Sequence, residues 1–332
     1  MKVKDIGEFA LIERIAEIVE HADERVILTI GDDTAVVRPT ESGYSLLTTD
    51  LLVENVHFTL DTINSWQLGY KSIAVNISDI AAMGGLPNYA VISLAMDPET
   101  DVDQIEDLYR GMEDASIKYG LRIVGGDVTK SEKLIINVAL LGEVEEENLC
   151  RRSDAMVGDV IMVTGELGAS AAGLRLILNP EIALKVKEAG ALKRAHFLPE
   201  PRVEPGRILA SLGINAMEDI SDGLVSEVKH ICEASSVGAR LFLNKIPVAK
   251  GVDKVATLTG ERAIDIAISG GEDYELVFTA PKELNGLVEK AMTAIGTRVA
   301  AIGEIVDISN GIKVIDWSGE ERPLEVSGYT HF

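Results

Sequence analysis

Apolar residues recur at three- and four-residue steps in several parts of the chain, which is the spacing of one face of an α-helix. A stripe that includes Phe9 and Ile12 predicts a helix over residues 8–21. A wider apolar face predicts a second helix over residues 65–82, with Ser65 as its N-cap. The sequence "MGGLP" then supplies two glycines and a proline that end this helix.

Short apolar runs between glycine, proline and polar clusters predict strands. In the first half these runs are "RVILTI", "TAVVR", "YSLLTTD", "NYAVISLAM", "LRIVGGD" and "KLIINVALLGEV", with a helix over residues 101–119 among them. In the second half "VIMVTG" predicts a strand, Ser170 and "MEDISDGL" open helices, and residues 263–280 predict a strand, a turn and a strand. This alternation predicts an α/β or α+β fold.

A charged, turn-rich stretch near residue 150 separates these halves, and it predicts two domains, 1–149 and 150–332. The chain carries 31 Lys and Arg against 54 Asp and Glu, a net charge of −23, which argues against a nucleic-acid or anionic-membrane surface. Its two cysteines form no metal or disulfide motif, the N-terminal region is charged, and no long apolar run occurs. We therefore expect a cytoplasmic protein.

Acidic residues stand beside Gly, Ser or Thr at six separate places that follow apolar runs or begin helices. They are Asp32 with Asp33, Asp50, Asp79, Asp127, Asp219 with Asp222, and Glu272 with Asp273. Any one of them is most simply a turn residue or a helix cap. Asp79 differs, because it falls inside a predicted helix beside the apolar face, where an unpaired carboxylate is costly.

Few basic residues accompany these acids, Lys71, Lys130, Arg151 and Arg152 being the nearest. Two carboxylates ~4 Å apart repel by roughly 4 kcal/mol at an effective dielectric constant near 20, so several that converge require cations. Oxygen ligands without His or Cys favour Mg²⁺, which commonly binds substrate phosphates. Neither a P-loop nor the kinase motif set occurs, although "GGDVTKS" and "VTGELGASAAGL" could cradle phosphates. The pattern predicts a phosphate site with several Mg²⁺ ions.

An ordered set of motifs spans nearly the whole chain and resembles a known family. The set includes "GDDTAVV", "TTDLLVENVHF", "KSIAVNISDIAAMGGLP", "GGDVTKS", "RRSDAMVGD", "DISDGL", "SGGEDYEL" and the terminal "SGYTHF". It resembles the thiamine-monophosphate kinase family, which belongs to the superfamily of aminoimidazole ribonucleotide synthetase, selenophosphate synthetase and a hydrogenase maturation factor. "VHF", "SGGEDYEL" and "GYTHF" point to this family within the superfamily.

The resemblance implies a two-domain α/β fold. Its N-terminal four-stranded sheet would pair with that of a second copy into a barrel, which gives a homodimer with nucleotide sites near the interface. The implied reaction transfers a phosphoryl group from ATP to thiamine monophosphate in line, assisted by several Mg²⁺ ions. It yields thiamine diphosphate, as the last step of that cofactor's biosynthesis. No residue is implied as a general base, because the nucleophile is an ionised phosphate oxygen.

The resemblance also implies roles for individual residues. The implied Mg²⁺ ligands are Asp33, Thr48, Thr49, Asp50, Asp79, Asp127, Asp219 and Asp222. The implied ATP contacts are Tyr109, Gly126, Asp127, Arg152 and Ser221. The implied contacts to thiamine monophosphate are His57, Glu272 and Tyr329. Asp32 is expected to brace the turn rather than to bind metal.

The chain departs from the family pattern at three places. Ala169 stands where the family usually has Asp, Glu218 adds a charge before Asp219, and residues 128–130 replace the usual threonines. Two other functions remain open from the sequence. One is another ATP-dependent synthetase of the superfamily, although no cysteine precedes Cys150 as selenophosphate synthetase would need. The other is a non-catalytic module that binds divalent cations, which would not explain an acid inside a helix.

Overall fold

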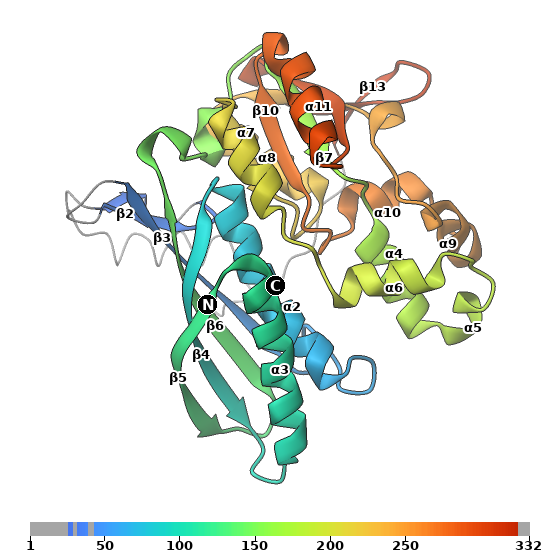
Figure 1. Ribbon diagram of the computed structural model, residues 1–332. Helices are drawn as coiled ribbons and strands as arrows, with labels where there is room; N and C mark the ends of the chain where they lie inside the picture. The colour runs from blue at the N-terminus through green and yellow to red at the C-terminus, as the bar shows by residue number, and fades with distance from the viewer. Residues whose placement is uncertain (1–25, 29–31, 39–42, 325–332) are drawn as a thin grey trace, which may run out of the picture.

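The computed structural model describes residues 26–28, 32–38 and 43–324. The helix predicted over residues 8–21 and the predicted substrate contact Tyr329 lie outside these ranges. The described chain forms two β-sheets, each covered by helices, and Figure 1 shows the blue-to-green sheet beside the part of the molecule coloured yellow to red. None of the helices in the described ranges is long and apolar enough to cross a membrane.

The N-terminal sheet has the strand order β1-β2-β3-β6-β4-β5, antiparallel except for the β4–β5 pair. Its strands are β1 Val26–Leu28, β2 Ala35–Val37, β3 Tyr44–Val53, β4 Leu86–Met96, β5 Arg122–Lys130 and β6 Ile135–Val144. Side chains alternate between the two faces of a strand. In β3, Leu46 and Leu52 are buried, whereas Leu47 and Leu51 are exposed on the other face. Among the described residues, nothing therefore covers this other face of the sheet, which we call the open face.

Helices α2 Ser65–Ala82 and α3 Val102–Tyr119 cover the buried face (Figure 1). The cap of α2 is Asn64 rather than the predicted Ser65, because Asn64 accepts from the Gln67 N–H and the Gln67 side chain returns the bond in a capping box. The two helices approach closely at Gly69 and Gly111. A Cβ atom at either position would collide with a backbone carbonyl of the other helix, so only glycine fits.

The second sheet has the order β13-β12-β9-β11-β7-β10-β8. Its strands are β7 Val160–Thr164, β8 Ala216–Asp219, β9 Gly238–Phe242, β10 Leu276–Ala280, β11 Val299–Val306, β12 Ile312–Ile315 and β13 Glu321–Pro323. Helices α7 Val203–Ser211 and α11 Asn285–Ala294 pack on one face, and α8 Leu224–Ser235 and α10 Ala263–Ser269 pack on the other. The helices α4 Ala169–Leu178, α5 Pro180–Ala183, α6 Ala189–Phe197 and α9 Val252–Thr259 form a further layer beside α10.

Two predicted elements differ in the structure. Residues 263–269 form helix α10 rather than a strand, because their alternating isoleucines are buried among helices α4, α8 and α9 instead of pairing in the sheet. The "GGD" sequence is not a turn but lies inside β5, which continues to Lys130. Its register with β4 shifts by one residue just before Gly125, so a bulge replaces the expected turn.

Helix α2 connects the two halves of the molecule. It packs on the N-terminal sheet and also contacts helix α7 and strand β8 of the second half. The backbone of α7 approaches α2 closely at Gly206, where a Cβ would collide with the Ala81 carbonyl. The last turns of α2 and the end of β8 therefore meet, and this junction holds the acidic residues described next.

Candidate active site

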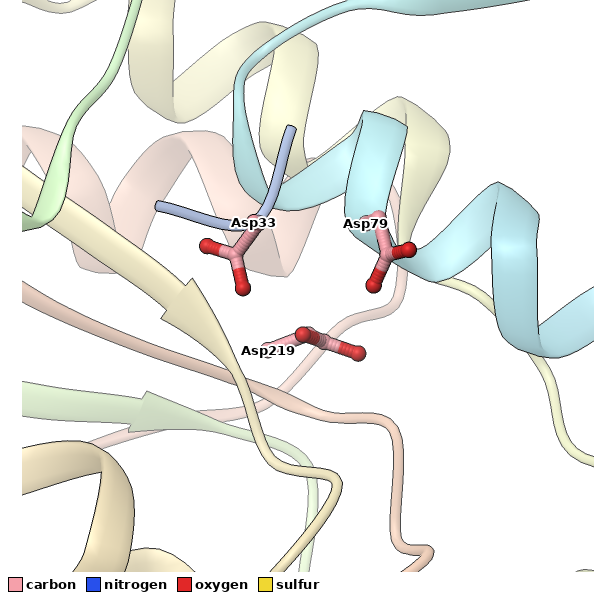
Figure 2. Close-up of side chains that lie close together, drawn as sticks. All are labelled: Asp33, Asp79 and Asp219. Carbon is pink, nitrogen blue, oxygen red and sulfur yellow. The ribbon is translucent and has the colours of Figure 1, made fainter. Parts of the chain in front are cut away.

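Three carboxylates from distant parts of the sequence converge at the junction. Asp33 precedes β2, Asp79 lies in α2, and Asp219 ends β8. One carboxylate oxygen from each lies within 4.8 Å of the others, and Figure 2 shows the three groups facing a common point. We call Asp33, Asp79 and Asp219 the carboxylate cluster. The convergence predicted from the acidic turns is thus present for these three residues.

Hydrogen bonds orient two of the three carboxylates. The Thr48 hydroxyl donates to Asp79 Oδ2, and the Ser78 hydroxyl donates to Asp219 Oδ2 at 2.5 Å. Asp33 Oδ2 is buried and has no hydrogen-bond partner among the residues that the structure describes. A buried acceptor without a donor is costly unless a cation or water satisfies it. The cluster therefore fits a bound cation.

The raised pKa values of the clustered carboxyl groups also favour a bound cation. Burial and the negative charge of Asp33 together raise the pKa of Asp219 to about 8. Burial, with the charges of Asp50 and Asp219, raises the pKa of Asp79 well above its ordinary value. Burial and Asp222 raise that of Asp50 to about 6. These groups ionise together only when a positive charge is added, and an all-oxygen ligand set favours a hard divalent cation.

Arg152 supplies the one guanidinium that reaches the cluster in the described chain. Its Nη2 lies 2.5 Å from Asp33 Oδ1 and 3.0 Å from Glu218 Oε1. Asp32 fixes the turn before β2, because its Oδ1 accepts from the backbone N–H of Asp33 at 2.9 Å and its Oδ2 accepts from the backbone N–H of Arg152 at 3.3 Å. The turn around Asp32 is therefore braced from both sides.

Glu272 is held by two basic side chains that sequence reasoning did not assign to it. Its carboxylate lies 2.7 Å from Lys71 Nζ and 3.1 Å from His196 Nδ1. Burial acts to raise the pKa of Glu272, but Lys71 and the hydrogen bond from His196 outweigh it and lower the pKa to about 2. The backbone of Glu272 has φ +64°, and its N–H donates to the Ser221 carbonyl at 2.6 Å. This contact ties Glu272 to the loop after Asp219.

Comparisons with known proteins place the chain in a family. Residues 31–144 match the family model "AIR synthase related protein, N-terminal domain", and residues 156–315 match the corresponding C-terminal domain. The chain is 38% identical to the thiamine-monophosphate kinase of Aquifex aeolicus, with 100% of both chains covered. It is 35% identical to that of Bacillus subtilis, over 98% of this chain and all of the relative.

The chain belongs to the thiamine-monophosphate kinase family. The solved structure of AaThiL complexed with AMPPCP and TMP matches it with a TM-score of 0.86 and 36% identity, covering 100% of this chain and 99% of that one. The hydrogenase maturation protein HypE of Escherichia coli matches with a TM-score of 0.70 at 19% identity, which shows the shared fold alone. The family and the α/β fold class predicted from the motifs are confirmed.

Two of the ligands predicted from the family resemblance lie away from the cluster. Thr49 follows Thr48 in β3, so its side chain is on the open face of the sheet, where its hydroxyl donates to the Val138 carbonyl at 2.9 Å. Asp127 pairs with Ser93 across the β4–β5 pair and is exposed on the edge strand. Three strand spacings of about 4.8 Å separate β3 from β5, so these two residues lie far apart on the open face.

The predicted ATP contacts of the family are also divided between several elements. Gly126 lies in β5, where a Cβ would collide with the Ile92 carbonyl, so this position requires glycine. Tyr109 lies in α3, half-buried against the N-terminal core. Ser221 lies in the loop after β8, next to the cluster and bonded to Glu272. The monomer thus places Ser221 and Arg152 at the cluster, and Gly126 on the sheet edge.

The remaining predicted site residues within the described ranges lie in loops. His57 follows β3, and its Nδ1 accepts from the Val53 N–H at 3.0 Å. Asp222 lies in the loop before α8, where its N–H donates to Glu227 Oε1 at 2.8 Å. Both residues are half-buried, and neither side chain is without a partner. Both roles stay predictions.

The first of the departures from the family pattern is compensated within the chain. Ala169 cannot cap α4, which it begins. Asp273, which is remote in sequence, caps the helix instead: its carboxylate accepts from the N–H of Gly168 at 2.6 Å and from that of Ser170 at 3.1 Å. An acid at a helix N-terminus satisfies free N–H groups and opposes the helix dipole. The start of α4 is therefore capped without an Asp at position 169.

Proposed function

We propose that the protein transfers the γ-phosphoryl group of ATP to thiamine monophosphate and so makes thiamine diphosphate. The carboxylate cluster carries this proposal, because it joins three acids, an unsatisfied buried oxygen on Asp33 and a neighbouring guanidinium at one point. The relatives named for this kinase, and the relative solved with AMPPCP and TMP, support the choice of substrates.

We further propose that the cluster holds Mg²⁺, with Asp33, Asp79 and Asp219 as ligands and with Thr48, Asp50 and Asp222 near them. When bound, such ions neutralise the negative charge of the ATP phosphates and of the acceptor phosphate. The chain itself contributes the alignment of these oxygens: Thr48 orients Asp79, Ser78 orients Asp219, and Asp32 fixes the turn.

The protein groups proposed to act on the substrates carry fixed charges and need not gain or lose a proton. The nucleophile is an ionised oxygen of the acceptor phosphate, so we assign no general base. Arg152 is a permanently charged donor next to Asp33, suited to phosphate oxygens. Glu272 stays ionised between Lys71 and His196 and is fixed to the Ser221 loop, so it is a rigid anion for a cationic thiazolium.

We also propose that the open face of the N-terminal sheet pairs with a second copy of the chain. This face exposes Leu47 and Leu51 in β3 and Tyr89 and Val91 in β4, and the half-buried Leu141 of β6 lies between Leu47 and Tyr89, so the apolar surface is of the kind that marks an interface. Edge strand β5, Arg122–Lys130, is also exposed, and an unpaired edge offers its N–H and C=O groups to another strand. Because β5 carries Gly126 and Asp127, a dimer would enclose these two residues, which are predicted to bind ATP and Mg²⁺.

We also propose that the chain divides into two domains, residues 1–149 and 150–332.

Turnover of ATP and thiamine monophosphate by the full-length chain in excess Mg²⁺ tests the function, with thiamine diphosphate as the measured product. We expect product to form, and to require both substrates and the metal. Thiamine without its phosphate serves as the control acceptor, since it lacks the proposed nucleophile. A folded protein that makes no thiamine diphosphate under these conditions would overturn the proposal.

A further inference from the structure

Glu218 is one of three carboxylates around the Arg152 guanidinium. Asp33 and Glu218 lie 2.5 Å and 3.0 Å from Nη2, and Asp32 is more distant, with its Oδ1 3.9 Å from Nε. Asp33 belongs to the carboxylate cluster, whereas Glu218 does not. Glu218 precedes Asp219 in β8, so the two side chains leave the strand on opposite sides. Glu218 is buried, and its Oε1 lies 2.9 Å from His230 Nδ1, which fixes the carboxylate from α8. Arg152 therefore spans from the cluster to an acid outside it.

A cation that binds Asp33 must share this carboxylate with Arg152. The guanidinium lies 2.5 Å from Asp33 Oδ1, and a divalent cation on the same group would be repelled by it. Arg152 keeps its positive charge in all ordinary conditions, so it cannot relieve the repulsion by losing a proton. The arginine therefore needs another anion if it is to leave Asp33 without leaving the site.

Two buried atoms without hydrogen bonds indicate that Glu218 can replace Asp33 as the partner of Arg152. Glu218 Oε2 and Arg152 Nε are both buried, and neither has a hydrogen-bond partner among the described residues. An arginine and a carboxylate can form two parallel hydrogen bonds, but in this structure no hydrogen bond joins Arg152 Nε to Glu218 Oε2. A small movement of the guanidinium from Asp33 toward Glu218 would therefore satisfy both atoms.

We propose that Glu218 is a positioning residue for Arg152, giving the guanidinium a second carboxylate so that it can move off Asp33 when a divalent cation binds there. The arginine then stays beside the metal site, where phosphate oxygens arrive. This inference rests on the metal site of the proposed function, and it explains a residue in which the chain departs from the family pattern.

A simpler effect has to be separated from this one. Glu218 adds a negative charge close to the cluster, and that charge alone favours cation binding at any ligand nearby. The two explanations differ in their dependence on Arg152. An effect of the electrostatic field persists when Arg152 is replaced, whereas a positioning effect disappears, and a double-mutant cycle measures this difference.

The experiment measures Mn²⁺ binding to the full-length chain without nucleotide, by electron paramagnetic resonance of the free ion. The proteins are wild type, Glu218→Met, Arg152→Met and the double variant, with circular dichroism as the check of folding. We expect Glu218→Met to weaken Mn²⁺ binding about tenfold, the size of one lost hydrogen bond between charged groups. In the Arg152→Met background the same change should alter binding by less than about twofold.

A conservative variant keeps the test decisive if Glu218→Met does not fold. Glu218→Gln retains one acceptor for Arg152 and should weaken Mn²⁺ binding by only about threefold. Equal weakening in both backgrounds, or none in either, overturns the inference while the metal site stands. A wild-type chain that binds no Mn²⁺ overturns the proposed metal site, and the inference falls with it.

Discussion

Replacing Asp219 with Asn should remove part of the pH dependence of stability when no divalent cation is present. Burial and the neighbouring charge of Asp33 raise the pKa of Asp219 from 3.8 to about 8. Between these two values the folded chain holds a proton that the unfolded chain releases, so stability is lost as the pH rises. One such proton amounts to about 1.4 kcal/mol per pH unit, or about 2.7 kcal/mol between pH 5 and pH 7.

The variant suits this test because Asn has nearly the same shape as Asp and cannot ionise. Its side chain can still accept the hydrogen bond that Ser78 donates to Asp219. The carboxylates of the cluster titrate together, so the remaining two take part of the proton uptake. We therefore expect the stability that Asp219→Asn gains over wild type to be larger at pH 7 than at pH 5 by about 1.5–2.5 kcal/mol.

Urea unfolding in EDTA at the two pH values, followed by circular dichroism, measures the difference. Asp307→Asn is the matched control: hydrogen bonds from Ser309 lower the pKa of this exposed acid, so its contribution to stability is lost only as the pH falls below about 4. Mg²⁺ should raise the stability of wild type at pH 7 and have little effect on Asp219→Asn. If Asp219→Asn and wild type lose the same stability between pH 5 and pH 7, the argument from buried, coupled acids is wrong.

Three further predictions concern other parts of the site. Lys71→Met should raise the pKa of Glu272 from about 2 and destabilise the fold by about 2 kcal/mol, as measured by urea unfolding. The loss should be smaller than for a fully buried ion pair, because the Glu272 side chain is 30% exposed. Adding Glu272→Gln to Lys71→Met should recover part of the lost stability, because it removes the unpaired carboxylate. Asp50→Asn and Asp127→Asn should keep the fold but reduce thiamine diphosphate formation more than tenfold, and normal turnover in both would refute the predicted metal roles of these two residues. Val91→Lys should convert a dimer into a monomer by light scattering, since a charge replaces an apolar side chain on the open face, whereas an unchanged mass would exclude this face as the interface.

Local patterns were sufficient for most of the fold. Helix α2 was predicted over residues 65–82, where the structure has it, because its apolar face is wide and glycine and proline follow it. Helix α10 was predicted as a strand, since Ile264, Ile266 and Ile268 alternate with other residues as they would in a sheet. These isoleucines are buried among several helices instead, so packing on all sides removed the polar face that marks a surface helix.

The candidate site was partly predictable for a similar reason. Asp79 was singled out as an acid in a helix interior, and it is one of the three clustered carboxylates. Strand alternation would also have separated Thr48 and Asp50 from Thr49, which lies on the opposite face of β3. The pairing of Glu218 with Arg152 and His230 could not be predicted, because it depends on how β8, α8 and the 150–154 segment pack together.

The charge partners of the acids decide which of them remain for a metal, and the sequence does not contain this information. Glu272 has Lys71 and His196 as partners, and Asp273 accepts two backbone N–H groups. Those two acids are therefore already satisfied by the protein. Asp79 and Asp219 have only a hydroxyl donor each from Thr48 and Ser78, and Asp33 keeps one unsatisfied oxygen beside Arg152. These five acids thus separate into two kinds: Glu272 and Asp273, which donors of the protein satisfy, and Asp33, Asp79 and Asp219, whose remaining acceptor capacity is available to a divalent cation.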